Sequence, residues 1–186
     1  VDPMPRGAPF ICLNATTGDV IFRIDGAFRG TVWGGKGVIG DSIIATMDTY
    51  DQRIYAIGKG PSATTVDVSF DAVPVGKGCT IRGKVLDESP GTKNPEIALR
   101  FPNGVPAIAD EYMDEWMEYL YMQKPCPMMI NGVEVKLETL DPNGNFYEIG
   151  TVTSDAAGMF KILWEPPVPG EYTIMATFDG SESQSP

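Results

Sequence analysis

Two strand–turn–strand segments near the amino terminus constrain the fold more than any other feature of this chain. The first segment is Cys12–Phe22, and the second is Gln52–Gly58, about 30 residues further along the chain. Gly18 allows the positive φ of a tight turn. Residues 20–25 then alternate between the two sides of the chain, which is the period of a strand. An antiparallel unit of this size cannot cover both of its faces, so we expect further polypeptide to bury the remaining apolar surface.

The composition argues against several functional classes. The formal net charge is -11, whereas binding to nucleic acid phosphates requires clustered Lys and Arg. The chain has no histidine, which excludes Ser-His-Asp and Cys-His catalysis and His-ligated zinc. No carboxylate spacing singles out an acid–base pair. We therefore expect a protein that is not an enzyme, with no catalytic residue, no metal site and no bound cofactor.

The pattern along the chain predicts an all-β fold in three zones. Residues 1–59 hold four short strands, the content of one propeller blade. Residues 60–78 are rich in Gly, Pro and Ser and form a linker with a possible first strand of the next domain. Residues 79–186 contain about seven strands separated by turns, which is typical of an immunoglobulin-like sandwich. No apolar run is long enough to insert into a membrane.

One helix interrupts the sandwich over about residues 110–123. Apolar residues recur there at spacings of three and four, and Pro125 follows its end. The segment 89–108 before it is rich in Pro and Gly and is expected to be a long loop. The helix also carries five carboxylates, which we interpret as a solvated face rather than a cation site: Asp110, Glu111, Asp114, Glu115 and Glu118.

The first zone resembles the last blade of PQQ-like-repeat β-propellers, found in secreted or membrane-associated proteins that are often archaeal. In that repeat an Ala-x-Asp-x-x-Thr-Gly-x-x-x-Trp stretch docks neighbouring blades. Three of five key positions differ here, and a Phe replaces the docking Trp. The cofactor of such propellers binds at the centre of a full ring, so the resemblance implies none for a single blade. The corresponding residues are Cys12, Asn14, Thr17, Gly18 and Phe22.

The third zone looks like the immunoglobulin-like module that commonly follows such propellers. The resemblance rests on a Gly-Val-x-Val-x-Leu start at Gly132–Leu137 and an Asp-x-Asn-Gly turn at Asp141–Gly144. It also includes a Pro-Gly-x-Tyr-x-Ile-x-Ala ending at Pro169–Ala176. These motifs carry information on fold more than on function.

Three further features are candidate sites. Asn14-Ala15-Thr16 is an N-glycosylation sequon. Cys79 and Cys126 lie at either side of the helical insertion, where a disulfide would fasten it in an oxidising compartment. Asp141–Asn145 offers oxygens at alternate positions, as a calcium loop does, although a hairpin turn explains the same residues better.

The favoured function is an extracellular or cell-surface structural module for assembly or adhesion. Its partners are other protein chains, which cover strand edges and the apolar blade face, including by β-strand addition. Two alternatives stay open: the end of a larger propeller protein whose active region lies elsewhere, and a carbohydrate-binding module with aromatic side chains that stack on sugars. The residues expected at the protein contact are Phe22, Ile24, Phe28, Trp33, Ile54 and Tyr55.

Overall fold

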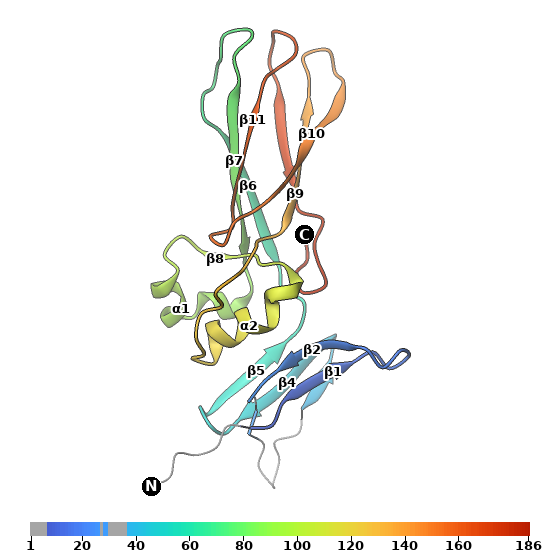
Figure 1. The fold of residues 1–186 in the computed structure, drawn as a ribbon, viewed down its shortest axis with the longest axis vertical. Coiled ribbons are helices and arrows are strands. Elements are labelled where there is room, and N and C mark those ends of the chain that lie inside the picture. The colour runs from blue at the N-terminus through green and yellow to red at the C-terminus, as the bar shows by residue number, and fades with distance from the viewer. Residues whose placement is uncertain (1–6, 27, 30–36) are drawn as a thin grey trace. The chain divides into compact units, whose positions relative to one another are not determined.

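The computed structural model describes residues 7–26, 28–29 and 37–186 (Figure 1). The chain divides into two compact units. The first, unit 1, combines the chain up to Lys59 with the segment Asp114–Cys126. The second, unit 2, consists of Gly60–Met113 and Pro127–Pro186. The described residues form mainly antiparallel β-sheet, which confirms the expected all-β class.

Unit 1 contains two small sheets in its described residues. Strands β1 (Phe10–Leu13) and β2 (Val20–Ile24) form a hairpin. Strands β3 (Val38–Gly40), β4 (Ile43–Asp48) and β5 (Arg53–Ile57) form a second sheet in that order. The strands lie where alternation predicted them, but they belong to two sheets and not to one four-stranded unit. The reason is that β2 has another partner at its second edge, as described below.

One sheet of unit 2 has the order β10 (Phe146–Thr153), β9 (Glu134–Leu140), β12 (Thr173–Thr177). The hairpin between β9 and β10 turns at Gly144, whose φ is 81°. Hydrogen-bonded pairs run along β9 on both of its edges. This strand is therefore the centre of its sheet.

The other sheet of unit 2 has the order β11 (Met159–Trp164), β7 (Cys79–Asp87), β6 (Ser62–Val68). The short strand β8 (Val105–Pro106) also pairs with β7. Strand β6 pairs with β7 along its whole length, so the possible first strand of the second domain within 60–78 is present and begins at Ser62. The β-branched residues of Thr64-Thr65-Val66 favour this strand more than the flanking Gly and Pro oppose it.

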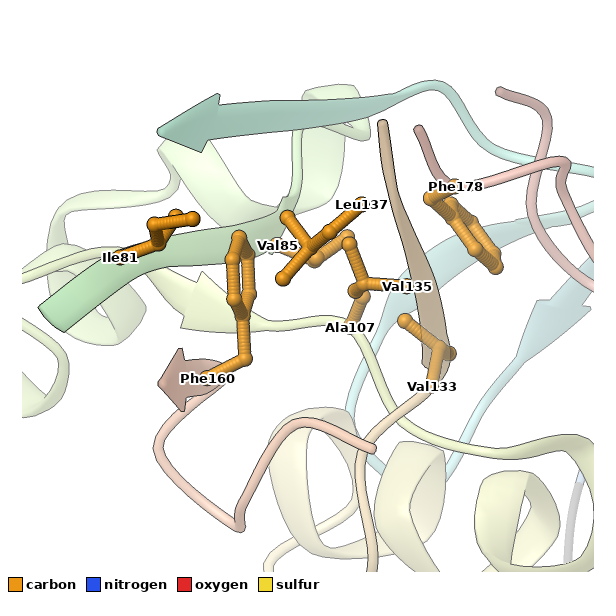
Figure 2. Close-up of a cluster of buried hydrophobic side chains, with 8 residues drawn as sticks. All are labelled: Ile81, Val85, Ala107, Val133, Val135, Leu137, Phe160 and Phe178. Carbon is orange, nitrogen blue, oxygen red and sulfur yellow. The ribbon is translucent and has the colours of Figure 1, made fainter. Parts of the chain in front are cut away.

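Side chains of both sheets of unit 2 meet in one hydrophobic core (Figure 2). The ring of Phe160 on β11 lies over Gly83 on β7, where a Cβ atom would come within 2.3 Å of the ring. Gly83 therefore makes room for the aromatic side chain at the centre of the sheet. The buried members of the core are Ile81, Val85, Ala107, Val133, Val135, Leu137, Phe160 and Phe178.

The predicted helix is present as α2 (Asp110–Tyr121). Three residues of its predicted apolar stripe, Met113, Trp116 and Leu120, are buried. This confirms that the stripe is a packing surface. The boundary between the two units falls within α2, after Met113.

The segment expected to be a long loop before α2 contains two short helices instead. A 3₁₀ turn, η1, spans Pro90–Lys93, and α1 spans Pro95–Arg100. The side chain of Asn94 accepts a hydrogen bond from the Glu96 amide at 3.1 Å, and Pro95 follows at the first helical position. Both residues are good helix starters, so the Pro that indicated a loop in fact begins a helix.

Candidate interaction surface

The two sheets of unit 1 share a small aromatic core. The rings of Phe10 on β1 and Phe28 lie 5.1 Å apart, edge to face, and the rings of Phe28 and Tyr55 on β5 also lie 5.1 Å apart. Ile24 is the buried β2 residue of this cluster, and Phe22 packs against it. The inner faces of both sheets are therefore occupied.

The helical segment of unit 1 completes this core. Met122 is buried in the same cluster as Ile24, and Tyr121 packs against it. The Tyr55 hydroxyl donates to the Tyr121 carbonyl at 3.2 Å and also to the Asp51 carboxylate. Burial and the hydrogen bond to Asp51 raise the pKa of Tyr55. A segment far along the chain thus supplies part of the cover that we expected from another polypeptide.

Two helix carboxylates bind backbone amides in β2 and at the residue that follows it. The Arg23 amide donates to Asp114 Oδ2 at 3.0 Å, and the Asp25 amide donates to Glu118 Oε1 at 2.6 Å. In an antiparallel pair only every second residue hydrogen-bonds to the partner strand, so these two amides, two residues apart, point away from β1. They are the donors that a further strand would use, and the two carboxylates satisfy them instead. We call this set of contacts the carboxylate ladder.

The spacing of the two elements explains why this ladder fits. Four helical residues span about 6.0 Å along a helix axis. Two strand residues span about 6.6 Å along a strand. Asp114 and Glu118 are four residues apart on α2, and Arg23 and Asp25 are two residues apart in sequence, so each carboxylate meets one amide.

Lys124 closes the end of the ladder. Its ammonium lies 2.9 Å from Glu118 Oε1 and also donates to the Asp25 carbonyl. Both side chains of this ion pair are mostly covered, with exposed fractions of 24% for Lys124 and 12% for Glu118. The Asp25 peptide groups are therefore held at both the amide and the carbonyl. Asp114, Glu118 and Lys124 together hold the free edge of β2.

The interpretation of the α2 carboxylate face as solvated holds for Asp110, Glu111 and Glu115, which are exposed. It was wrong for Asp114 and Glu118, which belong to the ladder. Burial raises the pKa of the Asp114 carboxyl, the nearby Glu118 and Asp25 carboxylates raise it further, and the Arg23 amide opposes them. The signal in the sequence was the four-residue spacing of acids, which alone does not reveal a strand as the partner.

The outer side of the β3–β4–β5 sheet is apolar and uncovered. Residues that pair across an antiparallel sheet share a face, and the register places Val38, Ala45 and Ala56 in one row and Met47 beside Ile54 in the next. Ile54 is 78% exposed and Val38 is 67% exposed. We call this set of side chains the outer face: Val38, Ile43, Ala45, Met47, Ile54 and Ala56.

The β1–β2 hairpin also exposes apolar residues on its outer side. Ile11, Leu13, Val20 and Ile21 are each exposed by between 43% and 58%. Arg23 shares that side with Ile11 and pairs with the Asp25 carboxylate at 2.8 Å. Exposed apolar side chains that gather in this way mark an interaction surface more often than scattered ones do.

The residues predicted for the protein contact lie in different places in the structure. Ile24 is buried in the core of unit 1 and is not available to a partner, so that prediction was wrong. Phe22, Phe28 and Tyr55 are half-buried and pack against the same core. Ile54 lies on the outer face, as a contact residue must. Trp33 lies outside the described residues. Alternation predicted these strands but could not tell which side of each strand the helix would cover.

The predicted disulfide is absent. Cys12, Cys79 and Cys126 are all free thiols, and all three lie in the described part of the chain. Cys79 is buried in β7 of unit 2, whereas Cys126 is exposed at the end of the helical segment of unit 1. The prediction failed because it assigned the whole helical insertion to the sandwich.

The sequon and the candidate calcium loop both form tight turns. Asn14 is exposed, and its side chain accepts hydrogen bonds from the Thr16 amide at 2.9 Å and the Thr17 amide at 3.2 Å. The Asp141 carboxylate accepts from the Asn143 and Asn145 amides at 2.8 and 2.7 Å. Asp141 thus braces the β9–β10 hairpin, as the hairpin interpretation required.

In unit 2, Asp110 fastens a segment close to the last residue of the sequence. Its carboxylate accepts hydrogen bonds from the Glu182 amide at 2.8 Å, the Ser183 amide at 3.1 Å and the Ser181 hydroxyl at 2.9 Å. Burial of the carboxyl acts to raise its pKa, but these hydrogen bonds together lower the pKa of Asp110. The same segment pairs with Gly60, whose amide donates to the Ser183 carbonyl at 3.0 Å.

A cavity of about 580 Å³ lies at one end of unit 2, between the β6–β7 and β11–β12 loops. Figure 1 shows these loops gathered at the same end of the sheets. Phe70, Trp164 and Tyr172 line the cavity together with Asp71 and Glu171. Its volume falls in the range of small-molecule sites.

Comparison of the chain with family models, with curated proteins and with solved structures finds no match. Within residues 7–26, 28–29 and 37–186, no group of three or more Cys, Asp or Glu side chains could hold a metal ion. None of the helices in these residues is long and apolar enough to cross a membrane.

Replacing Glu118 by alanine should destabilise unit 1 by about 1–3 kcal/mol, because the Asp25 amide and the Lys124 ammonium both lose a partly buried acceptor. Chemical denaturation monitored by the fluorescence of the tyrosines and tryptophans measures the change. Glu115→Ala removes an exposed carboxylate one residue after the ladder acid Asp114 and should change stability by less than about 0.5 kcal/mol. Equal effects of the two variants would contradict the ladder.

The aspartates Asp110 and Asp114 of α2 should titrate on opposite sides of the ordinary aspartate pKa of about 3.9. Asp114 should protonate above this value and Asp110 below it. Stabilisation from Asp110 is therefore complete above the ordinary pKa and is lost as the pH falls through the lower folded value. A carboxyl-detected NMR titration measures both midpoints, and the reverse order would contradict the described contacts.

Proposed function

We propose that this chain is a non-enzymatic structural module, of an extracellular or cell-surface type, that works by assembly with another polypeptide. The observation that carries the proposal is the outer face, where the described residues of the β3–β4–β5 sheet place six apolar side chains and no charged one. Full burial of a large apolar side chain such as Ile54 contributes about 1.5–3 kcal/mol. A partner that covers this surface therefore gains a substantial free energy.

The contact is made through a face and not through the edge of β2. Strand addition requires unpaired backbone donors and acceptors. The carboxylate ladder satisfies the Arg23 and Asp25 amides, and Lys124 binds the Asp25 carbonyl. A strand could enter there only by displacing the helical segment from the core of unit 1, and that would expose Met122 and Tyr121.

Two local features support the proposed domain types. In unit 1, a β-hairpin turn with Gly18 at a φ of 81° occupies the position of the propeller motif. In unit 2, the Tyr172 hydroxyl donates to the Val168 carbonyl at 2.8 Å and accepts from the Val168 amide at 3.1 Å. A tyrosine that binds the backbone a few residues upstream is a feature of immunoglobulin-like sandwiches. We propose a propeller-type unit joined to such a sandwich, with a glycan on Asn14.

Met47 tests this proposal because it reports on the outer face chemically. It should be oxidised to the sulfoxide by dilute hydrogen peroxide in the isolated chain, and much more slowly in material prepared from its native source without dissociation. Peptide mass spectrometry measures both rates. Met128, which is 99% exposed in unit 2, is the matched control and should react equally in the two samples. Equal oxidation of Met47 in both samples would refute the proposal.

The loop-end cavity of unit 2 favours a second function, carbohydrate binding. Phe70 is 66% exposed and lines the cavity with the carboxylates of Asp71 and Glu171. Sugars bind where an aromatic ring covers their apolar face and where polar groups accept from their hydroxyls. On this alternative the sandwich is the functional unit and unit 1 is its support.

A glycan-array screen of the intact chain tests the alternative. Phe70→Ala should abolish any binding found, because it removes the most exposed ring of the cavity. Phe146→Ala is the matched control, since Phe146 is 58% exposed on β10 and does not line the cavity. Absence of binding to all surface polysaccharides, or equal loss with both variants, would exclude this function.

A further inference from the structure

We infer that the loop-end cavity of unit 2 binds a sugar that carries a positive charge, namely an amino sugar whose amine is free. This inference rests on the carbohydrate-binding function proposed above and names the class of sugar. The properties that carry it are aromatic walls already in place, carboxylates without partners, and an excess of negative charge.

Two aromatic walls of the cavity are held in place by the protein itself. The rings of Trp164 and Tyr172 lie 5.1 Å apart and nearly perpendicular, at 84°. The Tyr172 hydroxyl donates to the Val168 carbonyl and accepts from the Val168 amide. Trp164 also packs against the hydrophobic core of unit 2. Because these rings are ordered in advance, a ligand that stacks on them pays little for fixing the site.

Two carboxylates at the cavity are open to a ligand. Asp71 and Glu171 both line the cavity and are exposed. Among the residues that the structure describes, neither carboxylate takes part in a hydrogen bond or an ion pair. Asp67 also lines the cavity, but its carboxylate is paired with Arg82 at 2.8 Å. An ammonium group donates up to three hydrogen bonds, so a bound amine can satisfy both open carboxylates.

The charge of the cavity distinguishes between classes of sugar. Lys77 is the cationic residue among the described lining residues. Glu165 adds a further carboxylate at the rim, because its Oε1 lies 4.0 Å from the position that a Cβ atom on the lining residue Gly76 would take. Unpaired negative charge therefore exceeds positive charge, in the same sense as the net charge of -11 of the whole chain. An acidic sugar is repelled, a neutral one gains nothing from this charge, and a cationic one is attracted.

Calorimetric titration of the intact chain with matched oligosaccharides tests the inference. One probe is a tetramer of β-1,4-linked glucosamine with free amines, and the other is the same tetramer with every amine acetylated. At about pH 6 ordinary carboxylates are charged, and so are free sugar amines. The free-amine tetramer should bind about threefold or more tightly than the acetylated one at low salt, and the preference should shrink at about 0.5 M salt. A blocked lysine tetramer carries the same charge without a sugar ring, and equally tight binding of it would overturn the inference.

Charge-removing variants locate the bound amine. Asp71→Asn and Glu171→Gln each keep an oxygen acceptor of the same size, so they should weaken the free-amine tetramer about threefold and leave the acetylated tetramer unaffected. Lys77→Gln removes the opposing ammonium and should strengthen binding of the free-amine tetramer. Glu182→Gln is the matched control, since Glu182 is an exposed carboxylate of unit 2 that does not line the cavity. An equal loss with the control variant would place the attraction in the whole chain and overturn the inference.

The outcomes separate this inference from the functions proposed above. Binding of both sugar tetramers without a preference for free amines would overturn the inference and leave carbohydrate binding in place. Binding of neither tetramer would also overturn it, and carbohydrate binding would be excluded as well if the glycan array showed no binding. The assembly function is independent of these results, because oxidation of Met47 tests it on the outer face of unit 1.

Discussion

The fold of unit 1 depends on two hydrogen bonds between a helix and a strand. Asp114 accepts the outward-pointing amide of Arg23 in β2 at 3.0 Å, and Glu118 accepts that of Asp25, the residue after β2, at 2.6 Å. The two carboxylates take the place of a neighbouring strand. Hydrogen bonds to charged acceptors are stronger than those between neutral groups, and a buried donor without a partner is costly. The same helical segment brings Met122 into the aromatic core. Without the ladder, β2 would present an open edge and the core would lose one side.

The ladder also determines where a partner can bind. A small β unit has two kinds of vulnerable surface, its strand edges and its apolar faces. The chain closes one edge internally with a segment from far along its sequence, and it leaves the outer face of β3–β4–β5 uncovered. We expected residues 1–59 to need further polypeptide to cover their apolar surfaces. Residues 114–126 cover its inner side, and a further chain is proposed for its outer side.

Local patterns predicted the elements of this protein better than their partners. Alternation located β2, β4 and β5, and the three-and-four spacing predicted α2 within two residues of its observed end. The ladder joins residues 91 and 93 positions apart, and no local period contains that information. The sequence predicts that the side chains of Tyr55 and Ile54 point to opposite faces of β5. It does not say which of the two faces the helix covers. The disulfide prediction failed because it assigned the whole helical insertion to the sandwich, whereas Cys126 belongs to unit 1.

The amide exchange rates of β2 test the central claim most directly. Residue-resolved hydrogen exchange by NMR on the isolated chain measures Arg23 and Asp25 against Ile11. The Ile11 amide points to the other edge of the hairpin, where the described residues place no further strand. The account predicts that Arg23 and Asp25 exchange as slowly as amides within a sheet, although no strand pairs with them, and that Ile11 exchanges fast. Fast exchange at all three would show that the helix does not hold the β2 edge, and would contradict the account.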